Sequence, residues 1–365
     1  MTTRRILSLV IALVALIAPV SCGTAASSPQ SASGARTAIP SSSPTNQPNV
    51  PAARLGAGLA YDSKHGYLLM FGGANTDQSA SPPPGFIRRS DSTNLVSNET
   101  WTWDGNRWTL LHPPSSPSAR SFPAMAFDPS SHQVILVDGG APNSDPGRSD
   151  MWTWDGATWT ELHPAHLPPA NSDKRVAIVD RDIGAVLIIA TDYTSGPPHF
   201  VIWRWTGSDW NQTDPVGAPS RRFGYGFAYD PDQHQEVLAA GYLSPEQSVG
   251  ETWLLKHGQW SQAPGSVGPT GYAAAAYDEA RHELVLMLAA GTPPRWADET
   301  WIWDGAAWTR QDPAHRPPGG LSSQSLAYDV TSGRVLMFGG KSDELGSNMI
   351  NQTWAWDGTD WARLT

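Results

Sequence analysis

Two tryptophans seven residues apart recur six times along this chain of 365 residues. The intervals between successive copies are 51, 51, 50, 48 and 53 residues, and 17 of the 18 tryptophans lie inside the copies. The pairs are Trp101/Trp108, Trp152/Trp159, Trp203/Trp210, Trp253/Trp260, Trp301/Trp308 and Trp354/Trp361. A nearly constant period of this length indicates a repeat architecture, in which each copy is one structural unit that packs against its neighbours.

Each copy has the pattern of four short strands. In the copy at 223–265, small and large residues alternate over 223–229, an apolar run follows at 237–240, and two aromatic strands flank a turn at Gly258. The apolar run recurs in every copy without alternation, so we expect that strand to be covered on both faces. Periods of about 40–50 residues with four strands are typical of propeller blades. The sequence therefore predicts an all-β fold, a six-bladed β-propeller over 51–365 with four antiparallel strands per blade.

The turns agree with this prediction. Trp-Asp-Gly occurs in four copies, and Asp-Gly between two strands is a strong hairpin pattern. Another turn begins at an aspartate in every copy and has histidine or glycine four residues later, which predicts a left-handed backbone there. A metal site built from these aspartates with His132, His234 and His282 is the alternative. We expect no metal, because glycine occupies the same position in the other three copies.

No strand is left over at either end of the repeat array. Each blade should therefore be continuous in sequence, and the sixth should close the ring by packing on the first without a swapped strand.

Glycine pairs at 72–73, 139–140 and 339–340 close the second strand of three copies. Together with the aromatic hairpins, these pairs resemble kelch repeats of the galactose-oxidase-type propeller superfamily. The resemblance covers about 51–365, although copies three, four and five lack the double glycine. It implies little about activity, because kelch propellers include both enzymes and binding modules. Radical-copper oxidases of that superfamily need a cysteine crosslinked to tyrosine, and the only cysteine here is Cys22, so that activity is excluded.

Residues 1–21 have the organisation of a secretion signal. Arg4 and Arg5 form a basic segment, and 6–20 is an apolar run of 15 residues. That run is short for a membrane-spanning helix and has the right length for a signal peptide. The protein is therefore predicted to be exported.

Cys22 directly follows this signal. A lone cysteine cannot form a disulfide within one chain, and its position resembles a bacterial lipobox, in which the cysteine carries a diacylglyceryl group. Pro19 departs from the leucine that this pattern prefers, and ordinary signal cleavage near Ala25 is the alternative. Residues 22–50 are rich in serine, proline and threonine, which predicts a flexible tether ahead of the propeller at 51–365. The expected location is extracytoplasmic, anchored to the bacterial cell membrane as a lipoprotein.

Charge and motifs exclude several functions. With 24 basic and 34 acidic residues the net charge is −10, whereas nucleic-acid binding favours a basic face. Zinc-protease spacing, a nucleophile elbow and a phosphate-binding glycine loop are absent from the sequence. We therefore expect no cofactor, no nucleic acid, a membrane contact through the lipid anchor only, and a monomer.

Loops that depart from the repeat template are candidate binding segments. The insertion at 74–98 carries Arg88 and Arg89, and the corresponding loop of copy five carries Arg295 and Trp296, the one tryptophan outside the repeats. We predict that these four residues contact a ligand, with neutral drift of tolerant loops as the alternative.

Three arginines occur eight residues before the repeated aspartate, in the segments that link the blades: Arg54, Arg120 and Arg222. At the mouth of a central channel, three guanidinium groups would suit an acidic ligand. The alternative is packing within each repeat, a role that the kelch pattern also gives to an arginine here. Glu99, Asp150, Glu251 and Glu299 precede the first tryptophan by two residues, and we expect them to accept hydrogen bonds from backbone amides.

The sequence favours a non-catalytic, membrane-anchored propeller that binds a protein or glycan at the cell surface, and it indicates no catalytic residues. The alternative is a carbohydrate mutarotase or epimerase, since bacterial six-bladed kelch proteins include sialate mutarotases. Such an enzyme needs two or three titratable groups within hydrogen-bond reach of the substrate at the channel mouth.

Overall fold

The computed structural model describes residues 49–76, 82–88, 95–140, 149–170, 175–193, 196–264, 268–292, 295–342 and 348–365, without the side chains of 290–297. The described residues all belong to one compact unit, Pro44–Thr365. The predicted signal peptide, Cys22 and almost all of the predicted tether lie outside the described residues. Within the described ranges, no helix has the length and hydrophobicity needed to cross a membrane.

Six four-stranded antiparallel sheets make up most of the described part of Pro44–Thr365. Sheet 1 contains β1 (Gly58–Asp62), β2 (Tyr67–Phe71), β6 (Thr100–Trp103) and β7 (Trp108–Leu111); sheet 2 contains β8 (Ala124–Asp128), β9 (Gln133–Val137), β10 (Met151–Trp154) and β11 (Trp159–Leu162); sheet 3 contains β12 (Val176–Asp180), β13 (Ala185–Asp192), β14 (His199–Trp205) and β15 (Trp210–Thr213). Sheet 4 contains β16 (Gly226–Asp230), β17 (Gln235–Ala239), β20 (Thr252–Lys256) and β21 (Gln259–Gln262); sheet 5 contains β22 (Tyr272–Asp278), β23 (Glu283–Thr292), β24 (Arg295–Trp303) and β25 (Trp308–Arg310); sheet 6 contains β27 (Ser325–Asp329), β28 (Arg334–Phe338), β31 (Thr353–Trp356) and β32 (Trp361–Arg363). Each sheet takes its four strands from one repeat copy, so the all-β prediction and the continuity of each sheet are confirmed for this part of the chain.

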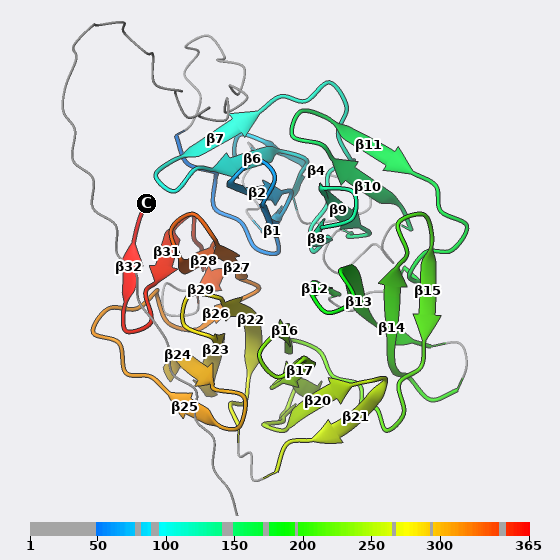
Figure 1. The fold of residues 1–365 in the computed structure, drawn as a ribbon. Helices are drawn as coiled ribbons and strands as arrows, with labels where there is room; N and C mark the ends of the chain where they lie inside the picture. The colour runs from blue at the N-terminus through cyan, green and yellow to red at the C-terminus, as the bar shows by residue number, and fades with distance from the viewer. Residues whose placement is uncertain are drawn as a thin grey trace, which may run out of the picture. The chain divides into compact units, whose positions relative to one another are not determined.

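The first strands of the six sheets meet around a common centre (Figure 1). Each first strand contacts the first strand of the next sheet, and β27 of sheet 6 contacts β1 of sheet 1. Because β27 pairs only within its own sheet, the last sheet closes on the first without exchanging a strand. This closure by packing alone agrees with the prediction made from the repeat array, in which no strand is left over at either end.

The core consists of layers between neighbouring sheets. All five residues of β2 are buried, and its Leu69 and Phe71 share one layer with Val134 and Leu136 of β9. The opposite face of β2 places Met70 in the layer shared with sheet 6. This two-sided cover is why the second strands are mainly apolar rather than alternating.

The second tryptophan of each pair reaches from its own sheet to the preceding one. The Nε1 of Trp159 in sheet 2 donates to Thr100 Oγ1 of sheet 1 at 3.0 Å, and that of Trp108 in sheet 1 donates to Thr353 Oγ1 of sheet 6 at 2.8 Å. Trp308, Trp361 and Trp210 repeat the contact with Thr252, Thr300 and the sulfur of Met151. Trp260 is the exception, since Ile202 occupies the acceptor position and the buried Nε1 has no partner among the described atoms.

Two further regularities organise the ends of the sheets. The connections between second and third strands pair with the segments that link the sheets, as in the bridges Leu55↔Ala74, Ser121↔Gly140 and Phe223↔Tyr242, so both lie on one side, here called the linker rim. The aspartate turns between first and second strands lie on the opposite side, here called the turn rim. The linkers and the variable loops therefore share one rim where these bridges form.

The double-glycine position needs a correction in sheet 2. Gly72 and Gly73 have φ angles of 71° and 109°, and the matching angles of 59° and 101° belong to Asp138 and Gly139. The structural pair is thus 138–139 rather than 139–140. A Cβ on Gly72 would lie 2.4 Å from the carbonyl oxygen of Arg120, so the next linker passes directly over this position.

Short strands extend the linker rim unevenly. Sheet 1 carries β3 (Ala74–Asn75), β4 (Phe86–Arg88) and β5 (Leu95–Ser97), sheet 4 carries β18 (Tyr242–Ser244) and β19 (Gln247–Ser248), and sheet 6 carries β26 (Leu321–Ser322), β29 (Lys341–Ser342) and β30 (Asn348–Met349). In sheet 5, β22 begins opposite Ala289 of β23. The hairpin of β23 and β24 continues for three more residue pairs beyond that point.

We predict that the indole–hydroxyl contact contributes measurably to stability. Thr100→Val keeps the side-chain shape but leaves the indole N–H of Trp159 buried without an acceptor, which should lower the free energy of unfolding by about 1–3 kcal/mol.

Position 202 offers the converse comparison, because Ile202→Thr supplies the acceptor that Trp260 lacks and Ile202→Val does not. Denaturant unfolding should show the threonine variant at 202 to be more stable than the valine variant by about 1 kcal/mol. Equal stabilities within both pairs would contradict this role.

Candidate functional site

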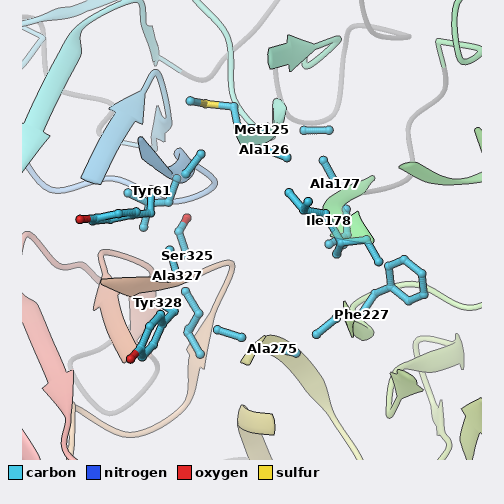
Figure 2. Close-up of a pocket in the computed structure, with 18 of the residues that line it drawn as sticks. Tyr61, Met125, Ala126, Ala177, Ile178, Phe227, Ala275, Ser325, Ala327 and Tyr328 are labelled. Atoms are coloured by element: carbon cyan, nitrogen blue, oxygen red, sulfur yellow. The ribbon is translucent and has the colours of Figure 1, made fainter. Parts of the chain in front are cut away.

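A cavity of about 600 Å³ lies between the first strands of all six sheets. Small side chains line it, and Figure 2 shows Ala126, Ala177, Ala275 and Ala327 facing one another from four sheets. Because six strands converge here, the inward positions have room only for glycine, alanine and a few larger apolar groups. The middle of the cavity is therefore apolar, and its polar groups are at the two ends.

The end at the turn rim is bordered by the residue that precedes each repeated aspartate: Tyr61, Phe127, Val179, Tyr229, Tyr277 and Tyr328. Tyr61 of β1 and Tyr328 of β27, both labelled in Figure 2, come from first strands that contact each other. Tyr61 Oη is 2.8 Å from Thr331 Oγ1, and Tyr277 Oη donates to Asp232 at 2.8 Å. Arg181 of sheet 3 and Glu279 of sheet 5 form an ion pair at this end.

The repeated aspartates themselves are turn residues. Asp62 Oδ1 accepts from the backbone amides of Lys64 and His65, both at 3.1 Å, and the equivalent contact recurs in the other sheets. The left-handed backbone predicted four residues later is confirmed, with φ between 54° and 74° for the histidine or glycine at that position in all six sheets. Among the described residues no cluster of acidic and histidine side chains could hold a metal.

The end at the linker rim includes Phe122, Arg175, Tyr225 and Gln324. Phe122 has φ 54°, a left-handed conformation that is costly for a large side chain, and its ring lies over the backbone of Gly56. Arg175 is buried and paired with Asp138, and burial lowers its pKa to about 10. The charged groups at both ends of the cavity are therefore already paired with one another.

The linker arginines do not border this cavity. Arg54, Arg120 and Arg222 are no more than 1% exposed, and each pairs with an acid of its own sheet: Glu99 at 2.7 Å, Asp150 at 2.5 Å and Glu251 at 2.8 Å. Burial lowers the pKa of Arg54 and Arg222, and their acidic partners oppose that shift. Their burial and pairing favour the packing alternative over the predicted ligand-binding role at the channel mouth, because a buried, paired guanidinium has little surface to offer a ligand.

The acids also have partners other than those predicted. Glu99 Oε2 accepts from Trp101 Nε1 at 3.0 Å, and Asp150, Glu251 and Glu299 accept in the same way from Trp152, Trp253 and Trp301. Each acid thus accepts from an indole N–H rather than from the expected backbone amide. The two-residue spacing of acid and tryptophan could have predicted this contact, because side chains two residues apart lie on the same face of a strand.

The four predicted loop residues are placed only in part. Arg88 is exposed at the end of β4, whereas Arg89 lies outside the described residues. The backbones of Arg295 and Trp296 lie in β24 opposite Thr292 and Gly291, and their side chains are outside the described set. The insertion of sheet 1 also has a packing function, because the Phe86 ring lies 4.9 Å from the guanidinium of Arg54 and helps to bury it.

Sequence reasoning missed an aromatic cluster on the linker rim. Phe223, Tyr242 and Tyr272 come from a linker, a loop hairpin and the start of a first strand, and their ring centroids lie 4.7–5.9 Å apart. Next to it along the chain, the guanidinium of Arg221 lies 5.3 Å from the ring centroid of Tyr193. No repeated pattern in the sequence marked this cluster, because the matching positions in the other copies hold residues of several kinds.

One buried acid also departs from the repeat. Glu236 of β17 is 7% exposed at a position that is apolar in the other copies, where Leu68, Val134, Val186, Leu284 and Val335 stand. Burial, followed by the charges of Asp180 and Asp182, raises its pKa from 4.5 to about 7. This group lies at the boundary of sheets 3 and 4, the boundary where Trp260 lacks an acceptor.

No family model and no curated protein sequence matches this chain. Among solved structures, that of YjhT is similar, with a TM-score of 0.58 and 12% identity over 87% of this chain and 99% of that chain. At this identity the similarity shows a shared fold alone, in agreement with the all-β, multi-sheet architecture.

We predict that Glu236 makes stability depend on pH. The folded state favours the protonated carboxyl of Glu236 and disfavours the ionised form. The contribution of this group to the free energy of unfolding is therefore fully present below about pH 4.5 and is lost as the pH rises through about 7. Glu236→Gln should match the wild type near pH 4.5 and exceed its free energy of unfolding by about 3 kcal/mol at pH 8.5. The control is Glu161→Gln at an exposed position, which should not alter the pH profile. A constant difference between wild type and Glu236→Gln across this range would show that Glu236 titrates normally.

Proposed function

We propose that this protein is a secreted, membrane-anchored, six-bladed kelch-like propeller that binds an extracytoplasmic protein or glycan without transforming it. Six sheets of one repeat each, closed by contact of β27 with β1, support the propeller architecture. The fold by itself is compatible with enzymes as well as with binding modules. The functional proposal therefore depends on the residues that line the cavity and its rims.

The observation that carries it is the pairing of the charged groups that border the cavity. Arg175 pairs with Asp138 and Arg181 with Glu279, so neither cation is aimed into the cavity without a partner. Acid–base catalysis needs groups within hydrogen-bond reach of the substrate and with pKa values near the working pH. An apolar cavity between paired charges favours binding over an epimerase-like reaction.

The variable loops of the linker rim are the proposed recognition surface, with Arg88, Arg89, Arg295 and Trp296 as contact residues. Arginine and tryptophan are the side chains that most often dominate interface energies. The β23–β24 hairpin extends beyond the rest of sheet 5, which presents residues 295–296 ahead of the sheet edge. Residues of this kind on a projecting hairpin suit a ligand that contacts the rim rather than the cavity.

The proposed location follows from the N-terminal sequence. Cleavage before Cys22 and attachment of a diacylglyceryl group would leave residues 22–50 as a tether between the membrane and the propeller at 51–365. The protein would then be an extracytoplasmic monomer whose contact with the membrane is the lipid anchor. No nucleic acid and no cofactor enter this proposal.

Loss of the loop residues should weaken binding without unfolding the protein. The full-length protein would be immobilised and used to capture partners from an extracytoplasmic extract, and affinity for a captured partner would be measured for wild type and for Trp296→Ala/Arg295→Ala. We expect a loss of roughly 2 kcal/mol or more in binding free energy, with a similar melting temperature. Unchanged affinity in a stable double variant would place the site elsewhere on the protein.

Cys22→Ala should release the protein from the membrane fraction. A diacylglyceryl group supplies two acyl chains, each buried methylene contributes about 0.8 kcal/mol, and a single chain gives only marginal binding. Fractionation followed by immunoblotting measures the distribution, and mass spectrometry of the mature N-terminus identifies the modification. An unmodified N-terminus at or beyond Gly23 in the wild type would disprove lipidation.

A further inference from the structure

Three aromatic rings from two sheets form a continuous cluster on the linker rim. Phe223, in the linker before β16, and Tyr242 of β18 are stacked with an interplanar angle of 17° and a centroid distance of 5.8 Å. Tyr272, the first residue of β22, lies 4.7 Å from the Tyr242 ring and 5.9 Å from the Phe223 ring. The cluster therefore joins sheets 4 and 5 across the boundary between them.

The backbone holds these rings in place before any ligand arrives. Phe223 and Tyr242 exchange two backbone hydrogen bonds of 3.0 and 2.9 Å. Gly224 has φ 67°, and a Cβ there would lie 2.4 Å from the Tyr272 ring, so this ring rests directly on the linker backbone. Rings fixed in this way lose little conformational entropy when they bind a partner.

Part of the cluster is open to solvent. Tyr272 is 37% exposed, although it follows a buried glycine and begins an inner strand. Tyr242 and Phe223 are half-buried beside it. Partial burial raises the pKa of Tyr242 and Tyr272, so both phenols stay neutral hydrogen-bonding groups at physiological pH.

Four exposed neutral polar residues lie near the rings in strand register or in sequence. Ser248 is paired in register with Tyr242, Gln247 is in the same strand, Ser220 precedes the linker residue Arg221, and Thr270 lies two residues before Tyr272. All four are exposed. Protein interfaces are enriched in aromatic residues but depleted in serine, whereas a sugar ring presents an apolar C–H face for stacking and hydroxyls for groups of this kind.

We propose that Phe223, Tyr242 and Tyr272 form a subsite that stacks a neutral pyranose ring of an oligosaccharide. This inference rests on the proposed binding function and specifies its ligand as a glycan. The neutral class follows from charge, because the protein carries a net charge of −10 and the exposed Glu246 lies in the turn of the β18–β19 hairpin that carries Tyr242, both of which disfavour acidic sugars.

The subsite is continuous with the proposed recognition loop of sheet 5. Tyr272 is opposite Ala289 in β23, and the hairpin then continues through Ala290 and Gly291, the residue opposite Trp296. Two residues of strand correspond to about 7 Å, comparable to the length of one sugar unit. An oligosaccharide lying along the rim would therefore reach both the aromatic cluster and the hairpin.

Calorimetric titration of the full-length protein, in a detergent without a sugar headgroup, would test the subsite. The probes are cellohexaose, xylohexaose, mannohexaose and chitohexaose as neutral oligosaccharides, with hexagalacturonate as the acidic comparison. We expect at least one neutral probe to bind and the acidic probe not to bind. Tyr272→Ala and Tyr242→Ala should each weaken binding roughly tenfold or more. Ile183→Ala, at an exposed position on the turn rim, should leave the affinity within twofold.

Saturation-transfer NMR on the wild type tests the same contact without a variant. Irradiation of the protein's aromatic protons should transfer magnetisation to the C–H protons of one face of a bound sugar. If a tyrosine variant fails to fold, this transfer decides the question, and its absence with a bound neutral probe would overturn the proposal.

The remaining outcomes separate the subsite from the general function. Unchanged affinity in folded tyrosine variants, or binding of the acidic probe alone, overturns the subsite and leaves a binding function in place. If a protein partner binds in a way that depends on Trp296 and no oligosaccharide binds, the assignment of the ligand as a glycan is wrong but the binding function stands. Faster anomeric exchange of a bound sugar, seen by NMR, contradicts the non-catalytic proposal. Absence of both glycan and protein binding contradicts the proposed function itself.

Discussion

The whole ring depends on the contact that carries each sheet onto its neighbour. The second tryptophan of a sheet places its indole in the boundary and, at five of the six described boundaries, donates its N–H to a side chain of the preceding sheet. One residue thus provides both a large apolar surface and a directional hydrogen bond. The boundary between sheets 6 and 1 uses the same tryptophan contact as the others. The ring therefore closes without an additional type of interaction.

Recurrence along the chain marks structural roles. The linker arginine, the acid two residues before the tryptophan, and the indole form a closed hydrogen-bonding group within a sheet, as with Arg54, Glu99 and Trp101. A buried ion pair of this kind is costly to break, because removing one partner leaves a buried charge. The recurrence of the arginines is therefore explained by packing within the sheet, as is that of the tryptophans.

The departures from the template gather at sheets 3 to 5. Trp260 lacks the acceptor that its counterparts have, Glu236 replaces an apolar residue, and the half-buried Tyr242 and the exposed Tyr272 bring two rings to the linker rim. Repeat proteins satisfy local rules wherever packing alone is at stake, so positions that break those rules are expected at functional or strained sites. These sheets also carry the proposed aromatic subsite and the β23–β24 hairpin, so the departures coincide with much of the proposed binding surface.

The sequence by itself determined the repeat, the four strands of each copy, the apolar second strand and the closure without a swapped strand. These features follow from local periodicity and turn chemistry, which short stretches of chain carry on their own. Only the tertiary structure decided which polar side chains face inward, because the partners of Arg54 and Arg120 lie 45 and 30 residues away. The same holds for Phe223, Tyr242 and Tyr272, since no spacing in the sequence specifies which loops of neighbouring sheets come into contact once the sheets have packed.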